Sequence, residues 1–234
     1  MLIALGLYLY DSSVLLFSNE GLLIASGDNR WYARLANRKF LLMGRALHIV
    51  NPLLPHRPAF RLAWMLEGAL APEQQTSWSA SALALRPLAP LTLLAGIALF
   101  AVLPLGLFTG LGIKAVIAAL LLLYGSIGAA LLRLYRRRSL IDMKGRHFSA
   151  FAFECLACPP FGVNMIRRIT LTQKILEPLP VAAHRLLDAD HWQSTRQQCM
   201  ALLDDRIALL AEEADRRSAL LERRSELMAY GAAA

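Results

Sequence analysis

The chain has 234 residues, a formal net charge of +8 and a mean hydropathy of +0.44. Hydrophobic residues make up 56% of it and charged residues only 18%, whereas an ordinary soluble domain carries about 25% charge. This excess of apolar residues argues against a protein that is only a soluble core.

Residues 1–87 predict a small β-rich cytoplasmic domain followed by a linker. The apolar run LIALGLYLY and the runs SVLLFS, RWYARLA, KFLLM and ALHIV are separated by turn clusters such as SNEG and SGDN, which is typical of five or six short strands. The prolines of NPLLPHRP exclude regular structure. The stretch FRLAWMLEGAL is a candidate short helix, and APEQQTSWSAS is a candidate polar linker. We do not expect a cleaved signal peptide, because the first run lacks a basic start and ends at Asp11 without small residues.

The next stretch predicts a two-helix transmembrane hairpin. Between residues 87 and 132 the only charged residue is Lys114, and a helix of about 20 apolar residues crosses the roughly 30 Å hydrocarbon layer. We expect the turn between Pro104 and Lys114, where glycines and a proline interrupt the run. The small residues within 125–130 favour a close contact between the helices. The alternative is a buried hairpin of a soluble protein. The expected hairpin covers 88–134, with spans of about 88–106 and 114–134.

Basic residues flank the hairpin on its outer sides. Residues 133–174 hold nine Lys or Arg and two acids, so they carry most of the net charge. Short basic flanks stay in the cytoplasm, so we expect both termini on the cytoplasmic side of an inner membrane. Nucleic acid is not an expected partner, because no motif of a nucleic-acid reader accompanies the charge. The collar expected to face anionic lipid headgroups comprises Arg133, Arg136, Arg137, Arg138, Arg167 and Arg168.

The segment 135–187 is expected to be a basic juxtamembrane or interfacial segment. It contains Cys155 and Cys158 in the apolar stretch FSAFAFECLACPPF, where cysteines act as small apolar residues. Replacing both with serine should then be mild. Palmitoylation of these cysteines is another option. No cofactor is expected, since nothing repeats the C-x-x-C pair, but zinc or iron is the alternative. Its candidate ligands are Cys155, Cys158 and His147 with one of His184, His191 or Cys199.

Residues 188–234 predict a long amphipathic or coiled-coil-like helix. Apolar residues recur with a seven-residue spacing, until Arg217 and Arg224 occupy the second row. Two alternatives remain open: pairing with another chain, or packing onto the chain's own domain. The candidate partner-binding row is Met200, Leu203, Ile207 and Leu210.

The expected fold class is therefore a membrane α+β protein. No phosphate loop, HExxH or GxSxG motif occurs, so an enzyme is not the favoured reading. We expect a non-enzymatic two-pass inner-membrane protein that anchors or assembles a partner complex at the cytoplasmic face. The alternatives are a membrane-bound metal or redox protein, and an oligomeric channel or membrane-disrupting effector.

Overall fold

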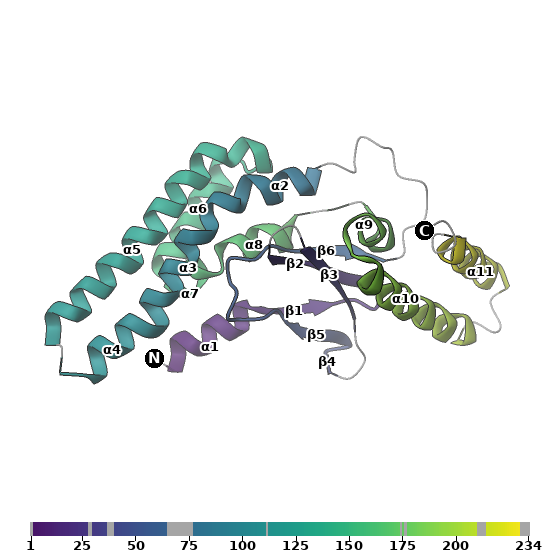
Figure 1. Ribbon diagram of the computed structural model, residues 1–234, viewed down its shortest axis with the longest axis horizontal. Helices are drawn as coiled ribbons and strands as arrows, with labels where there is room; N and C mark the ends of the chain where they lie inside the picture. The colour runs from purple at the N-terminus through teal and green to yellow at the C-terminus, as the bar shows by residue number, and fades with distance from the viewer. Residues whose placement is uncertain are drawn as a thin grey trace.

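The computed structural model combines two small antiparallel sheets with two long apolar helices (Figure 1). The long helices project to one side of the sheets, and helices from the C-terminal third cover the opposite side (Figure 1). The structure describes residues 2–27, 30–36, 40–64, 77–110, 112–173, 175, 177–209 and 214–229.

The first element is a helix, α1 (Leu2–Asp11), so the expected strand over this run is wrong. A short apolar run suits a buried strand and a buried helix equally well by its pattern alone. Here the helix is stabilised by its neighbours. Tyr8 is buried, its ring lies 4.7 Å from that of Phe100, and its hydroxyl donates a hydrogen bond to the carbonyl oxygen of Pro52.

Six strands form the two sheets, and every pairing between them is antiparallel among the described residues. One sheet has the order β1-β5-β4 and the other β3-β2-β6. The sequence predicts a short helix over 60–70, but residues 60–63 belong to a strand that pairs with β2, and residues 65–70 lie outside the described residues. The strands are β1 (Ser13–Leu16), β2 (Glu20–Gly27), β3 (Arg30–Leu35), β4 (Leu41–Leu42), β5 (Arg45–Ile49) and β6 (Ala59–Ala63).

Strand β2 is buried on both faces. Leu22 and Ile24 contribute to an apolar cluster with residues of β1 and β5, which lies between the two sheets. Leu23 points the other way, as the alternation of a strand requires, and packs with residues from the C-terminal helices. The sheets therefore carry one core between them and a second core on the outer face of β3-β2-β6.

The first long helix is built from several helical pieces, with Pro87 and Pro90 at its 3-10 turn and Pro104 just after its π-helical turn. A proline has no backbone N–H and displaces the preceding turn, and a π-helical turn over Ala98–Val102 lies directly before it. The helix still continues to Phe108, so the chain reverses only between Phe108 and Gly112. The pieces are α2 (Ser77–Leu85), a 3-10 turn (Arg86–Leu88), α3 (Ala89–Ile97), the π-helical turn and α4 (Leu103–Phe108).

The second long helix, α5 (Gly112–Arg137), runs back alongside the first. Gly112 starts it with a φ of +72°, a conformation that suits glycine. Close contact between the two helices occurs at Gly106, where an added Cβ would lie 3.3 Å from the backbone nitrogen of Val116. The expected contact through 125–130 holds only in part, because Gly125 and Gly128 face open space.

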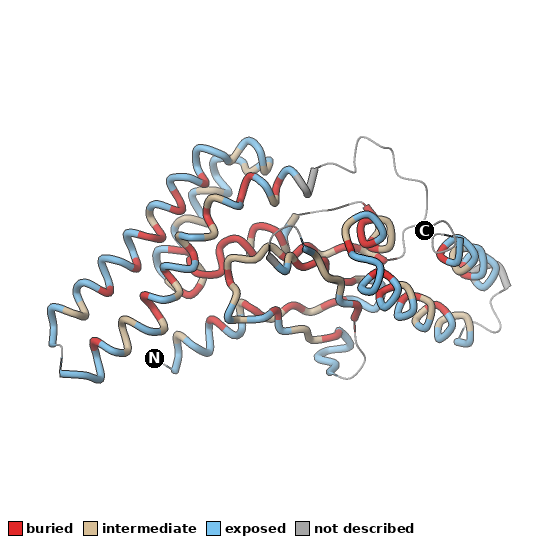
Figure 2. The backbone as a smooth tube through the Cα atoms, viewed as in Figure 1, coloured by how far each residue is buried: buried red, intermediate tan, exposed pale blue. Residues whose placement is uncertain are grey.

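Both long helices are long and apolar enough to cross a membrane. They are continuous over Ala80–Phe108 and Gly112–Ile141. In the most apolar 18-residue stretch of each helix, only 28% of the first and 33% of the second is buried. Figure 2 shows the consequence, since exposed backbone dominates the part of the hairpin farthest from the sheets. The hairpin made by α3, α4 and α5 thus presents a large apolar surface outward.

The C-terminal third packs onto both parts of the fold. Helices α6, α7 and α8 contribute to one core with α1 and the hairpin, while α9, α10 and α11 contribute to the core on the outer face of β3-β2-β6. The helices are α6 (Gly145–Ala157), α7 (Pro159–Val163), α8 (Met165–Thr172), α9 (Leu179–Leu186), α10 (Ala189–Leu209) and α11 (Ala214–Ala229).

Candidate functional site at the base of the hairpin

Four of the expected collar arginines gather where the two long helices meet the body. Arg133 donates a hydrogen bond of 3.0 Å to the carbonyl oxygen of Pro87, and Arg137 donates one of 3.4 Å to that of Ala84. The Arg138 guanidinium lies 4.1 Å from the centre of the Tyr135 ring. Arg136 is exposed. The side chains of Arg133 and Arg137 thus join the end of α5 to the start of the other long helix. Together with Arg136 and Arg138 they form a positive rim around the base.

Arg167 does not belong to this rim, and its expected lipid-facing position is wrong. Only 1% of it is exposed. The apolar side chains of Ile166 and Ile169 hold α8 in the core beside the hairpin, and this places Arg167 against the loop after β5. Its guanidinium donates hydrogen bonds to the carbonyl oxygens of Asn51 and Leu54. Burial lowers the pKa of Arg167 to about 10.

Arg168 is also committed to contacts within the chain. Its guanidinium lies 2.5 Å from a carboxylate oxygen of Glu154 and 3.6 Å from one of Asp11. It also lies 4.3 Å from the centre of the Phe161 ring. Arg168 therefore ties α8 to α6, α7 and α1, rather than reaching a headgroup as the sequence predicts.

These contacts belong to a buried polar cluster of Asp11, Ser12, Asn164, Arg167 and Arg168. The side-chain amide of Asn164 donates a hydrogen bond of 2.9 Å to the hydroxyl of Ser12. Burial is the main cause that raises the pKa of Asp11, and the nearby Arg168 opposes it. Several buried polar atoms of the cluster have no protein partner, among them one carboxylate oxygen of Asp11 and two guanidinium nitrogens of Arg167.

The contacts of the cluster connect α1 and the loop after β5 to α6, α7 and α8. Sequence reasoning missed Asp11 and Asn164 as members. One signal was present, because Asp11 is the only charged residue among the first 19. A single acid at the end of an apolar run needs a positive partner if the run is buried, and Arg168 supplies it.

The cysteines and histidines expected as metal ligands are not brought together. Cys155 is fully buried in the core with the hairpin, whereas Cys199 is buried in the core of the outer sheet face. His184 packs edge-on against Trp192, with ring centroids 5.2 Å apart. His191 contacts the carboxylate of Asp188 at 2.7 Å.

Across the part of the chain that the structure describes, no group of three or more His, Cys, Asp or Glu is placed to hold a metal ion. His147 is exposed on α6, and Cys158 is half-buried at the end of that helix. Burial raises the pKa of Cys155 to about 12 and that of Cys199 to about 12. Both buried thiols are therefore neutral and unreactive at physiological pH.

The expected partner-binding row packs largely within the chain. Leu203 is buried in the core of the outer sheet face, and Met200 and Ile207 pack against that core. Leu210 lies outside the described residues. The sequence left open whether this helix pairs with another chain or packs onto its own domain. Helix α10 packs onto its own domain.

Helix α11 packs against α10, and its buried residues differ from those of the predicted stripe. Leu220 and Leu227 are buried, whereas Leu221 and Met228, which the seven-residue spacing selects, are exposed. Arg196 of α10 donates a hydrogen bond of 3.0 Å to the carbonyl oxygen of Leu227, which helps to fix this arrangement. A second face of α11 therefore remains uncovered.

No family model, no curated protein and no solved structure matches this chain.

Proposed function

We propose that this chain is a two-pass membrane protein whose hairpin anchors the body of sheets and helices at a membrane surface. The observation that supports this best is the exposed apolar surface of the hairpin. In the most apolar 18-residue stretch of each long helix, only 28% of the first and 33% of the second is buried. The core helices of a soluble protein are mostly buried. Apolar surface in contact with water costs about 25 cal/mol per Å², and a bilayer removes that cost.

The distribution of charge supports one orientation of this anchor. The arginine rim lies at the base of the hairpin, and Lys114 alone lies near its turn. Because Lys and Arg flanks remain on the cytoplasmic side, we place the body and both termini in the cytoplasm, at an inner membrane. The rim then lies at the level of the anionic headgroups, where each basic residue contributes roughly 1 kcal/mol.

The body would serve as a non-enzymatic platform for a protein partner. The surface that supports this role is the uncovered face of α11, where Leu221 and Met228 are exposed. Apolar side chains three or four residues apart on a helix, and by extension seven apart, lie on one face. We therefore assign the partner contact to α11 and not to the row on α10.

Reporter fusions test the topology directly. A fluorescent protein at either end should be fluorescent, and alkaline phosphatase should be active only when it is inserted at the turn near Gly110. The protein should also remain in the membrane pellet after alkaline carbonate extraction. Phosphatase activity from either terminus, or release by carbonate, would refute the proposal.

The orientation has a separate test in the rim. Arg136→Glu places a negative charge at an exposed position of the rim, so we expect weaker retention by vesicles that contain anionic lipid. Arg217→Glu, at an exposed position of α11, is the matched control and should change nothing. Equal retention of both variants would contradict the role of the rim.

A further inference from the structure

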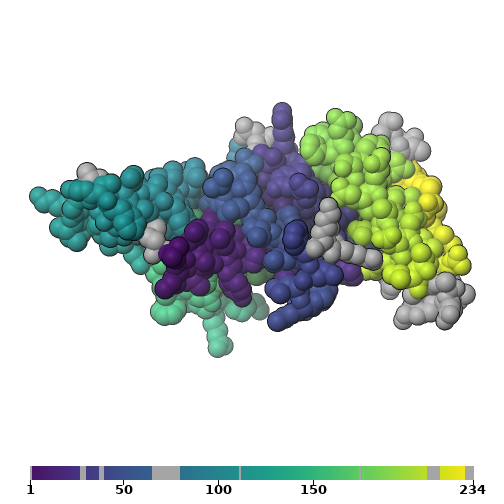
Figure 3. Space-filling view, turned by 90° about the horizontal axis from the view of Figure 1, so that it is seen from below, coloured from purple at the N-terminus to yellow at the C-terminus, as the bar shows by residue number. Residues whose placement is uncertain are grey.

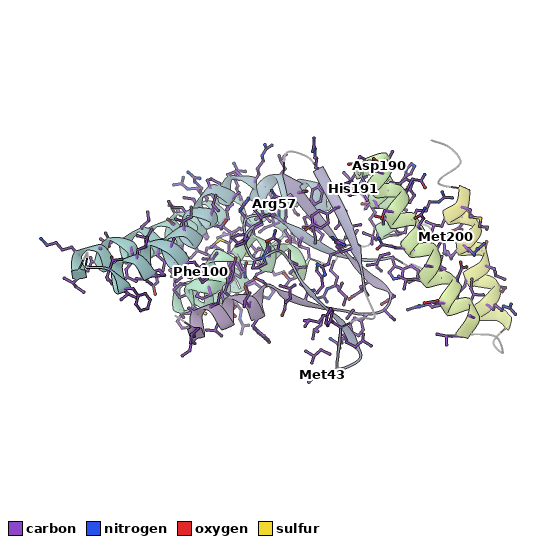
Figure 4. All side chains as sticks on the ribbon, turned by 60° about the horizontal axis from the view of Figure 1, so that its bottom comes forward. Met43, Arg57, Phe100, Asp190, His191 and Met200 are labelled. Atoms are coloured by element: carbon purple, nitrogen blue, oxygen red, sulfur yellow. The ribbon has the colours of Figure 1, made fainter. Side chains whose placement is uncertain are left out.

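The turn between β4 and β5 exposes four consecutive apolar residues. Phe40 is 72% exposed and Met43 is 92% exposed, with Leu41 and Leu42 exposed between them. The pairing of Leu42 with Arg45 leaves Met43 and Gly44 as a two-residue turn. Their φ angles are +52° and +75°, as such a tight turn requires. Figure 4 shows Met43 at the outer end of this turn, pointing away from the body.

Met43 is an unfavourable residue for this turn. Asparagine, aspartate or glycine normally occupies a position with positive φ, and a bulky side chain there is an outlier. Backbone strain of this kind persists where a site requires it. The side chain that the strain presents is apolar and almost fully exposed, which indicates an apolar surface opposite it.

A basic residue lies directly beside the same turn. Arg45 follows it directly, and its guanidinium lies 4.1 Å from the centre of the Phe17 ring. Apolar residues beside a basic one match the interface of a bilayer with anionic lipids, where the chains meet the headgroups. A protein partner would not need this combination.

Helix α1 exposes a second apolar surface. Leu2 is 85% exposed, and Ile3, Leu9 and Tyr10 are exposed as well. The helix carries no charge before Asp11, which is held by Arg168. Its ten residues span about 15 Å, or half of the hydrocarbon layer. This length suits contact with a single leaflet.

An apolar groove joins α1 to the hairpin. Its volume is about 550 Å³, and its walls come from α1, the loop around Pro52 and the first long helix, including Gly96 and Phe100. The only hydroxyl in its lining belongs to Tyr8, which donates its proton to the carbonyl oxygen of Pro52. Apolar cavities offer water no hydrogen-bond partners, so lipid chains fit this groove better than solvent does.

The β4-β5 turn, α1 and the turn of the hairpin lie on the same side of the molecule. In Figure 1 the hairpin turn, the start of α1 and β4 all lie toward the lower edge. Figure 3, seen from that edge, shows α1 lying beside the hairpin on the face toward the viewer. A membrane that surrounds the hairpin would therefore approach α1 and the β4-β5 turn as well.

We infer that α1 and the β4-β5 turn contact the bilayer that surrounds the hairpin, so that the body is held against the membrane at three places. This inference rests on the proposed membrane anchor. It deepens that proposal by naming the bilayer, and not a protein, as the partner of both surfaces. The body is then oriented by the membrane rather than tethered loosely above it.

Site-specific fluorescence in vesicles tests this inference. The full chain with Cys158→Ser leaves only the buried Cys155 and Cys199 as native thiols, so an environment-sensitive dye can be placed on single introduced cysteines. Met43→Cys and Leu2→Cys report on the two new contacts. Leu121→Cys on the hairpin and Leu221→Cys on α11 are the membrane and water references. Phospholipids with a nitroxide on the acyl chain serve as the quencher.

We expect quenching and a blue-shifted emission at Met43, Leu2 and Leu121, and neither at Leu221. If Leu121 is quenched but Met43 or Leu2 is not, the inference is overturned and the anchor remains intact. A lack of quenching at Leu121 would overturn the anchor and the inference together.

Discussion

Replacing Leu121 with arginine separates a membrane hairpin from a soluble one. Leu121 lies near the middle of α5 and is 70% exposed. At the centre of a membrane helix, leucine contributes about −0.3 to −0.6 kcal/mol to insertion, and arginine costs about +2.5 to +3.5 kcal/mol. The change should therefore cost about 3–4 kcal/mol, which lowers the insertion equilibrium roughly 100-fold or more.

Leu132→Arg is the matched control. Leu132 is also exposed on α5, but it directly precedes Arg133 at the base. It lies roughly 16 Å nearer the rim along the helix, from a rise of about 1.5 Å per residue. An arginine at this level can extend its charged end to the interface, so Leu132→Arg should insert almost as well as the unaltered chain.

The assay is glycosylation mapping of insertion in microsomes, with carbonate extraction as a second measurement. In a soluble protein an exposed leucine changed to arginine would alter stability by only about 0.5 kcal/mol. Equal insertion of Leu121→Arg and Leu132→Arg would show that the hairpin does not cross the bilayer. A soluble, folded Leu121→Arg protein would show the same.

Three further predictions concern the body. Arg167→Met removes two charge-assisted hydrogen bonds but also removes a buried charge. We expect the free energy of unfolding to fall by roughly 2–3 kcal/mol and the melting temperature by about 5–10 °C. An unchanged melting temperature would show that Arg167 does not stabilise the fold. The two cysteines should respond differently to serine, because only Cys155 lies in the apolar core. Cys155→Ser places a hydroxyl there and should lower stability by about 1–3 kcal/mol. Cys158→Ser should lower it by less than about 0.5 kcal/mol. Equal unfolding midpoints for the two would show that Cys155 is not in the core. Leu203→Asp should lower stability by at least about 3 kcal/mol without changing oligomeric mass, and Leu221→Asp should leave stability intact. Dissociation of an oligomer by Leu203→Asp at unchanged stability would restore the row on α10 as a partner surface.

The two long helices and most of the strands could be predicted from the sequence. The absence of charge between residues 87 and 132, apart from Lys114, is a local property that no tertiary contact can alter. Turn residues likewise divided 13–49 into short strands before any pairing was known. Both signals are carried by neighbouring residues, which is why they can be read from the chain alone.

Which surfaces meet depends on the tertiary structure and could not be predicted from the sequence. The first apolar run is a helix because Tyr8 packs against Phe100, and Arg167 is buried because Ile166 and Ile169 hold α8 in the core. Helix α11 buries Leu220 and Leu227 rather than their neighbours, because α10 lies on that side. Periodicity shows which residues share a face, but burial also depends on partner surfaces that are distant in the sequence. That dependence brought Asp11, Asn164 and Arg168 together, although Asp11 lies more than 150 residues from the other two in the sequence.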